Sequence, residues 1–182
     1  MIATVRLVLR DWRESDLEPF AAMNADPRVM EYFPRTLTRA ESDAMVARNR
    51  AFLGAGEPGL FALERDGEFL GFAGLAVPRF DAWFTPCVEI GWRLAAHAWG
   101  HGYATEAALA VVDHAATLGL EDLVSFTAVL NEPSQRVMER IGMTRDRAFD
   151  HPLLPADHRL TPHVLFRMRV SSATRAETGE QG

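Results

Sequence analysis

The feature of this sequence that most constrains its fold is a strand, a short glycine-containing loop and a nearly all-apolar helix that follow one another directly. Residues 88–94 alternate apolar and polar side chains, which predicts a strand with one buried face. Residues 104–118 are almost all apolar, and their polar side chains fall on one narrow stripe, which predicts a helix buried on most sides. Such a helix has to be covered by other elements, so we expect layers of helices on a sheet.

The other elements follow from the same periodicities. Asp66-Gly67 is typical of a two-residue hairpin turn, and Thr38 with Glu41 forms a capping box at a helix start. Further strands are predicted at residues 4–10, 60–64, 69–77, 123–129, 143–149 and 163–170, and further helices at residues 16–25, 38–53 and 133–141. This order predicts one domain of mixed α+β type, residues 1–170, and a flexible polar tail, residues 171–182.

Charge and composition exclude several classes of function. The chain has 19 basic and 25 acidic side chains, and its net charge of −6 disfavours binding driven by nucleic-acid phosphates. The longest apolar run, residues 70–77, is far shorter than the roughly 20 residues of a membrane-spanning helix. Residues 1–10 lack the pattern of a signal peptide, and the single cysteine, Cys87, cannot form an internal disulfide. We therefore expect a cytoplasmic protein without nucleic-acid or membrane partners.

The loop before the buried helix has the chemistry of an anion site. The first amides of a helix have no partners within the helix and lie at its positive end, so they attract phosphate groups. Gly100 and Gly102 would let such a group approach the backbone closely, although both would also suit a tight turn that needs positive φ. The loop lacks the third glycine of a dinucleotide fingerprint, and the chain has no GK[ST] motif. A phosphate or pyrophosphate ligand of another kind is therefore expected.

The same loop resembles a motif of the GNAT superfamily of acyl-CoA-dependent N-acetyltransferases, and WGHGYATEA resembles its RimJ/RimL-like branch. Trp99-x-x-Gly102-x-Ala104 is similar to the family pattern R/Q-x-x-G-x-G/A, with Trp99 in place of Arg or Gln. The resemblance covers about residues 4–170. It implies an α/β (α+β mixed) fold with a central mixed, mostly antiparallel sheet of about seven strands and about four helices. It also implies that acetyl-CoA binds along the loop and the preceding strand, at Trp92, Arg93, Leu94, Trp99, Gly100, His101, Gly102, Tyr103, Ala104 and Thr105.

A second segment, which begins at Asn131, resembles the family's N-x-x-[AS] motif. The resemblance implies that Asn131 contacts the pantetheine arm of CoA. Many relatives carry a tyrosine general acid where this chain has Met138, and Ser134 is the replacement we expect. The alternative for Ser134 is a hydroxyl that satisfies a backbone amide at the helix start.

The chemistry of acetyl transfer to an amine needs an uncharged nucleophile. An α-amino group, with a pKa of about 7.7 to 8.0, is partly neutral at pH 7, whereas a lysine near 10.4 is almost fully charged. Glu89 is the candidate base, directly or through a water, because it lies opposite the core-facing side of its strand. Its alternatives are a solvated carboxylate or an ion pair with Arg93. His163 is a second candidate base, with a structural role as its alternative.

Four aromatic residues lie in loops that flank the acceptor entrance in this family: Tyr32, Phe33, Trp83 and Phe84. They are expected to contact the acceptor, although aromatic side chains in loops also pack locally.

Other chemistries fit less well. His97 and His101 are four residues apart but lack the glutamate of a metal hydrolase motif, and Gly100 opposes a helix there, so no metal is expected. Cys87 has no feature that would lower the pKa of its thiol. The prediction is an acetyl-CoA-dependent N-acetyltransferase that acts by direct attack in a ternary complex, as a monomer or homodimer. The acceptor is a protein N-terminus or a small-molecule amine, and the alternative is a non-catalytic acyl-CoA sensor on the same fold.

Overall fold

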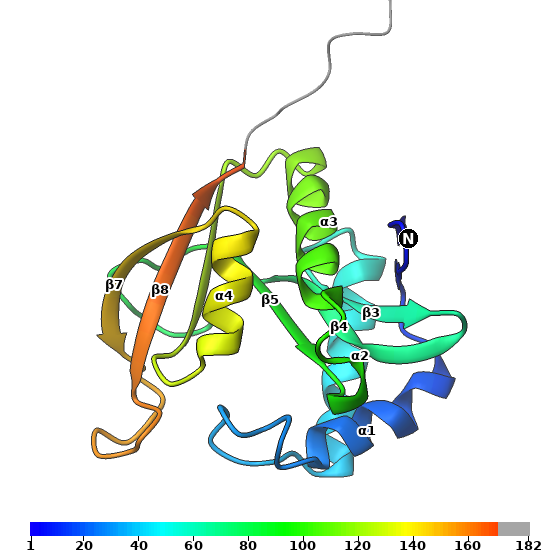
Figure 1. Cartoon of the computed structure of the whole chain (residues 1–182), viewed down its shortest axis with the longest axis horizontal. Coiled ribbons are helices and arrows are strands. Elements are labelled where there is room, and N and C mark those ends of the chain that lie inside the picture. The colour runs from blue at the N-terminus through cyan, green and yellow to red at the C-terminus, as the bar shows by residue number, and fades with distance from the viewer. Residues whose placement is uncertain (171–182) are drawn as a thin grey trace, which may run out of the picture.

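An eight-stranded sheet with the order β1-β2-β3-β4-β5-β6-β8-β7 forms the centre of the computed structural model, which describes residues 1–170 (Figure 1). The strands are β1 (Ile2–Ala3), β2 (Val8–Arg10), β3 (Leu60–Arg65), β4 (Glu68–Ala76), β5 (Glu89–Leu94), β6 (Asp122–Ala128), β7 (Thr144–Asp150) and β8 (Pro162–Arg169). The helices are α1 (Leu17–Ala25), α2 (Arg39–Gly54), α3 (Tyr103–Thr117) and α4 (Glu132–Arg140), with 3-10 turns at Glu14–Asp16 and Ala96–Ala98. The predicted tail lies outside the described residues.

The mixed, mostly antiparallel sheet is confirmed, and so are the four helices, but the strand count is eight instead of about seven. The difference lies at the N-terminus, where a single strand over residues 4–10 was the wrong prediction. The Thr4 amide donates to the Leu7 carbonyl at 2.9 Å, and the Leu7 amide donates to Thr4 Oγ1 at 2.9 Å. This turn leaves Val5 97% exposed and folds β1 back antiparallel to β2.

Local signals in the sequence set two boundaries as predicted. Asp66 and Gly67 both have positive φ, 52° and 85°, and join β3 to β4 as the hairpin turn requires. The Thr38 side chain accepts from the Glu41 amide while the Glu41 carboxylate accepts from the Thr38 amide, so the capping box starts α2.

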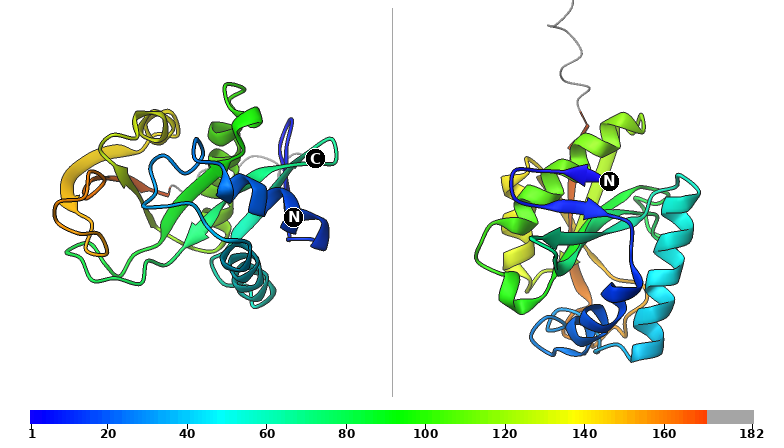
Figure 2. Two further views of the ribbon diagram at one scale, coloured as in Figure 1. Left: turned by 90° about the horizontal axis from the view of Figure 1, so that it is seen from below. Right: turned by 90° about the vertical axis from the view of Figure 1, so that its right-hand side faces the viewer.

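The helices cover both faces of the sheet. Alternate residues of β4 point to opposite sides, so Leu75 joins the core beneath α3 and α4 while Phe72 joins the core beneath α1 and α2. Figure 2 shows α2 on the opposite side of the sheet from α3. Every helix in the described part of the chain is too short or too polar to cross a bilayer.

The sheet is nearly divided at its centre. β5 and β6 are parallel and pair at one position, Glu89 with Val124, where the Val124 amide donates to the Val88 carbonyl at 3.0 Å. Past that point β5 and β6 separate. Figure 1 shows the two halves of the sheet diverging, with β5 in one half and β8, the neighbour of β6, in the other. The edge of β5 that faces β6 therefore lacks a strand partner over most of its length within residues 1–170.

Candidate active site

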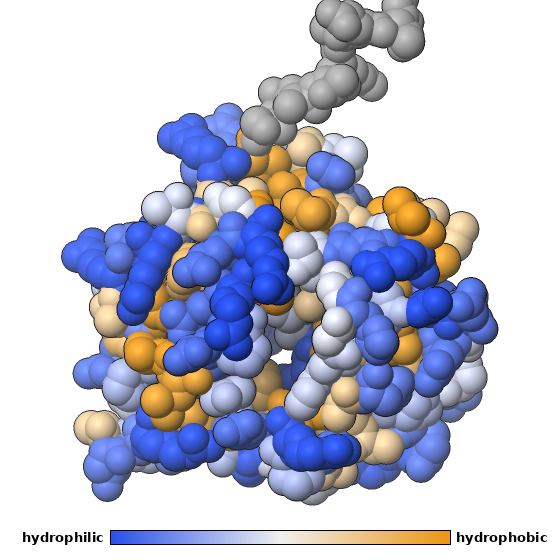
Figure 3. All heavy atoms as spheres, in the orientation of Figure 1, coloured by the Kyte–Doolittle hydropathy of each residue, from blue (hydrophilic) through white to orange (hydrophobic). Residues whose placement is uncertain are grey.

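A cavity of about 890 Å³ lies where β5 and β6 separate. The start of α3, the start of α4, strand β5, the α1–α2 connection and the segment that leads into β8 all contribute to its walls. Figure 3 shows the hollow near the middle of this face. The cavity is thus bounded by both halves of the sheet and by the predicted anion site.

The glycine loop adopts the geometry of an anion-binding helix start. Gly100 and Gly102 have φ of +79° and +78°, so the tight turn and the anion site are served by the same residues. The Glu106 amide makes the first helical bond, to the Gly102 carbonyl at 3.1 Å. The three preceding amides of α3, at residues 103–105, are thereby left for a ligand.

Arg6, which no sequence pattern singles out, holds this loop in place. Its Nη1 donates to the His101 carbonyl at 2.9 Å, and its Nε donates to Glu106 Oε2 at 2.7 Å. The guanidinium also lies over the Tyr103 ring, 4.8 Å from its centroid. Because Arg6 is some hundred residues from the loop in sequence, no local pattern could reveal this contact.

Trp99, which replaces the usual Arg or Gln, is bound to the end of β5. Its Nε1 donates to the Leu94 carbonyl at 2.9 Å, while 48% of the residue is exposed. The indole therefore ties the loop to the strand and lines the cavity, but it presents no charge to a phosphate.

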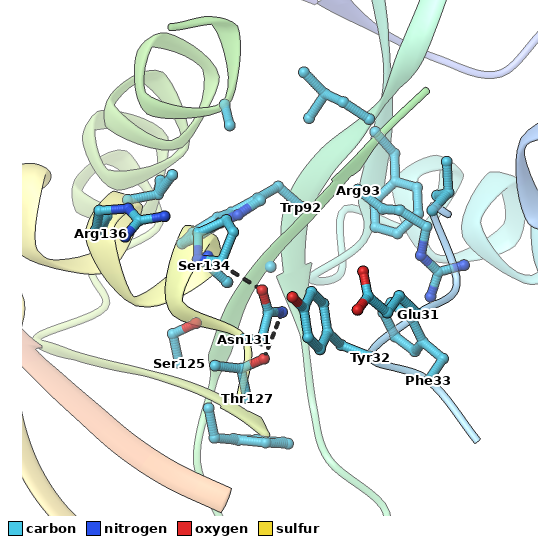
Figure 4. Close-up of a pocket in the computed structure, with 18 of the residues that line it drawn as sticks. Glu31, Tyr32, Phe33, Trp92, Arg93, Ser125, Thr127, Asn131, Ser134 and Arg136 are labelled. Carbon is cyan, nitrogen blue, oxygen red and sulfur yellow. Dashed lines mark hydrogen bonds between the residues drawn. The ribbon is translucent and has the colours of Figure 1, made fainter. Parts of the chain in front are cut away.

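Asn131 and Ser134 lie together at the start of α4 (Figure 4). Asn131 Oδ1 accepts from the Ser134 amide at 3.3 Å, and Asn131 Nδ2 donates to Thr127 Oγ1 at 2.9 Å. The capping role considered for the Ser134 hydroxyl thus belongs to Asn131, and both residues line the cavity. Met138, at the family's tyrosine position, is 1% exposed and packs in the core.

Glu89 faces the cavity from β5, at the point where the strands separate. Burial raises the pKa of its carboxyl to about 8. Within residues 1–170 the carboxylate makes no ion pair with Arg93 or any other base, so the ion-pair alternative has no support. An acid in this environment accepts a proton readily once it is ionised.

His163 also lines the cavity but is a weaker base. Burial, with a smaller contribution from the nearby His151 at a ring-centroid distance of 4.8 Å, lowers the pKa of its imidazole to about 4. Its Nδ1 lies 3.2 Å from the Thr161 carbonyl. The imidazole is therefore neutral at pH 7 and holds a proton poorly.

The four aromatic residues expected at the acceptor entrance divide into two pairs. Tyr32 and Phe33, in the α1–α2 connection, line the cavity (Figure 4). Phe84 is instead buried in a small core against β6 and β8, and Trp83 lies under Arg147, 3.7 Å from its ring centroid. The structure does not bring Trp83 and Phe84 to the cavity.

Of the predicted CoA-binding residues, those from Trp92 to Thr105 line the cavity together with Asn131, except His101. The His101 side chain stacks on Tyr103, with ring centroids 5.2 Å apart. His97 lies 3.1 Å from Glu68, so the two histidines have different partners.

The divided sheet and the free amides at the start of α3 agree with the fold that the resemblance to acyl-CoA-dependent N-acetyltransferases implied. Residues 6–144 match the family described as "Acetyltransferase (GNAT) domain", and the chain belongs to this family. Acetyl-CoA dependence is general within it.

Individual relatives support this assignment over most of the chain. YnaD of Bacillus subtilis, an uncharacterized N-acetyltransferase, is 29% identical over 150 residues, 81% of this chain and 85% of the relative. A solved acetyltransferase from Agrobacterium tumefaciens has 31% identity and a TM-score of 0.73 over 92% of each chain. A GNAT-family acetyltransferase from Bacillus anthracis has 26% identity and a TM-score of 0.75 over 92% of this chain and 97% of that one.

Proposed function

We propose that this protein is an N-acetyltransferase that transfers the acetyl group of acetyl-CoA to a primary amine by direct attack within a ternary complex. The observation that carries the proposal is the continuity of the cavity. One wall holds the free amides of α3, and the open edge of β5 leads from there to Glu89.

The residues present fit acetyl-CoA as the acyl donor. The amides of residues 103–105 and the two glycines would hold the pyrophosphate, and the unpaired edge of β5 at residues 92–94 would pair with the amide groups of pantetheine. Arg136 and Arg140 on α4 also line the cavity and would supply positive charge for the phosphates.

The reacting groups meet near the start of β5. The amine nitrogen attacks the acetyl carbonyl carbon and the carbon–sulfur bond breaks, while the ionised Glu89 takes a proton from the amine, directly or through a water. A β5 backbone amide donates to the acetyl oxygen. Ser134, across the cavity on α4, is the proposed donor of a proton to the departing thiolate, and the proton that Glu89 has taken returns to the Ser134 oxygen through water. Because a thiol has a pKa near 8.5, a weak donor suffices.

The acceptor is proposed to be a protein N-terminal α-amine or a small-molecule amine, with the chain in the RimJ/RimL-like branch on the basis of its WGHGYATEA motif. Neighbours of 16% identity include a Salmonella typhimurium enzyme that modifies the N-terminal serine of L7/L12 and a Vibrio cholerae spermidine N-acetyltransferase. Such identities show a shared fold alone, so both acceptor classes are to be assayed.

Isothermal titration with acetyl-CoA tests the donor site without knowledge of the acceptor. We expect micromolar binding by the native chain and its loss in Gly102→Glu, whose carboxylate repels the pyrophosphate. Gly102→Ala is the matched control, because it imposes the same positive-φ strain without the charge. Equal affinity in the Glu and Ala variants would contradict the site. Binding without thiol release across a broad amine panel would favour a sensor over an enzyme.

A further inference from the structure

One face of β5 carries a carboxyl group, a position without a side chain and a guanidinium in succession. Glu89, Gly91 and Arg93 alternate along the strand and all line the cavity. Gly91 has no side chain, and the one neighbour that a Cβ there would meet within 4 Å is Glu89 Oε1, at 4.0 Å. The face therefore forms an open channel that runs over Gly91, with the Cα atoms of Glu89 and Arg93 about 13 Å apart at strand spacing.

Arg93, at one end of this channel, has no carboxylate partner in the described chain. Arg93 lies over the rings of Phe33 and Phe72, 3.9 Å and 5.4 Å from their centroids, and its Nη1 donates to Asn24 Oδ1 at 2.6 Å. Its Nε is buried and has no hydrogen-bond partner in the described chain. Within residues 1–170 no carboxylate lies within 4 Å of the guanidinium.

Arg93 is half-buried, and a partly desolvated cation without a counter-ion is costly for the folded state, so it is an unusual feature to find in a cavity wall. Burial lowers the pKa of Arg93 to about 10, which still leaves the group charged at neutral pH. The neighbouring base, Arg28, is different because its Nη2 is 2.7 Å from Asp26 Oδ2. Glu31 also borders the cavity (Figure 4) but makes no ion pair with Arg93 in the described chain.

We propose that Arg93 recognises an anionic group of the acceptor, which extends over Gly91 while its amine lies beside Glu89. The inference rests on the proposed function and adds the class of acceptor. Because Glu89 Oε1 leans over Gly91, the two charged groups of the protein are closer than the Cα atoms, separated by on the order of two to three strand residues. An ω-amino carboxylate has the required chemistry, and so does a peptide N-terminus with an acidic side chain a few residues along.

A length series of acceptors tests this proposal. The acceptors are ω-amino carboxylates with two to ten methylenes, the matching ω-amino amides, and C-terminally amidated peptides with one glutamate at position two, three or four. At saturating acetyl-CoA, we expect the KM of the best carboxylate to be at least tenfold lower than that of its amide. The peptides distinguish the two sources of the anion, because a preferred glutamate position indicates a peptide acceptor.

Variants of the channel identify the residue responsible. Arg93→Met is expected to abolish the preference for the carboxylate, because the variant removes the guanidinium and leaves the strand backbone in place. Arg28→Met is the matched control and should keep the preference, because that arginine already has a carboxylate partner. Gly91→Val fills the channel and should raise the KM of every long acceptor at least tenfold. It also keeps the proposal testable if Arg93→Met does not fold.

Failure of this inference is separable from failure of the proposed function. Titration of the CoA-loaded protein with the N-acetylated carboxylates and amides measures recognition even where turnover is slow. Equal affinity for the two series, or an unchanged preference in Arg93→Met, overturns the role of Arg93. Loss of acetyl-CoA binding by the native chain would instead overturn the proposed function.

Discussion

Glu89 is a carboxyl group that burial keeps mostly protonated at pH 7, because its pKa is raised to about 8. As the proposed base, it acts in the ionised form. We expect kcat to rise about tenfold per pH unit from pH 6 and to level off above pH 8. Glu89→Gln should lower kcat about a hundredfold at pH 8.5, remove the inflection and leave the Kd for acetyl-CoA unchanged. Equal turnover by the two proteins from pH 6 to 9 would exclude Glu89 from the mechanism.

The same carboxyl group links stability to pH. Between its unfolded pKa of 4.5 and its folded pKa of about 8, the folded state holds a proton that the unfolded state has lost. The stability contributed by the neutral carboxyl is therefore fully present below pH 4.5 and is lost as pH rises towards 8. We expect Glu89→Gln to match the native Tm at pH 4.5 and to exceed it by several degrees at pH 8.5, measured by thermal denaturation. A constant difference across this range would mean that the carboxyl is solvated.

At the residue scale, the sequence predicted some positions and could not predict others. The alternation of β5 placed Glu89 opposite the core, and the structure places it at the cavity. The orientation of Arg93 towards the acceptor side follows the same alternation, but its lack of a counter-ion depends on which groups the α1–α2 connection brings near. Trp83 and Phe84 were expected at the acceptor entrance from the family resemblance, which does not specify how a loop packs.

At the scale of elements, α3 depends on the N-terminal turn for the position of its first residues. Arg6 neutralises Glu106 and binds the His101 carbonyl. Removing the guanidinium leaves an acid near the proposed pyrophosphate site and frees the loop. We expect Arg6→Ala to weaken acetyl-CoA binding about three- to tenfold, since a single solvated charge near the site contributes modestly in water.

A double variant separates charge from loop position in this prediction. Arg6→Ala combined with Glu106→Gln removes the uncompensated acid and should recover more than half of the lost binding free energy, as measured by titration. No recovery would show that Arg6 acts by holding the loop. Affinity unchanged in Arg6→Ala would contradict both roles.

Element boundaries were predictable where a local signal was strong. The hairpin at Asp66-Gly67 and the capping box at Thr38 both act through backbone groups a few residues apart. The N-terminal turn was not predicted because the alternation of residues 4–10 suits a strand, whereas the Thr4 hydroxyl and the distant Glu106 stabilise a reversal of the chain.

At the scale of the whole molecule, the proposed direct transfer predicts no acetylated enzyme. Cys87 lines a second cavity with Pro86 and Arg167, and burial raises the pKa of its thiol, so it is a poor nucleophile. Cys87→Ser should retain activity within twofold, and double-reciprocal plots for the native chain should intersect. An acetylated peptide that disappears on addition of amine, seen by mass spectrometry, would contradict direct transfer.

The periodicity of the sequence predicts helices on a mixed sheet, but it does not reveal where the sheet opens. Glu89 and Val124 are 35 positions apart, and the separation of their strands depends on packing by α3 and α4 from one side and the α1–α2 connection from the other. Motif resemblance predicted the donor loop, whereas the shape of the cavity beside β5 depends on the assembled fold.

Because β5 and β6 pair at a single position, acetyl-CoA bound between them would also stabilise the fold. In the proposed complex, a pantetheine arm that hydrogen-bonds along β5 takes the place of a missing strand and links two halves that otherwise share one register position. The free energy of unfolding then rises with the concentration of acetyl-CoA, as the reaction rate does. Amide hydrogen exchange in β5 and β6 should slow together when acetyl-CoA is added.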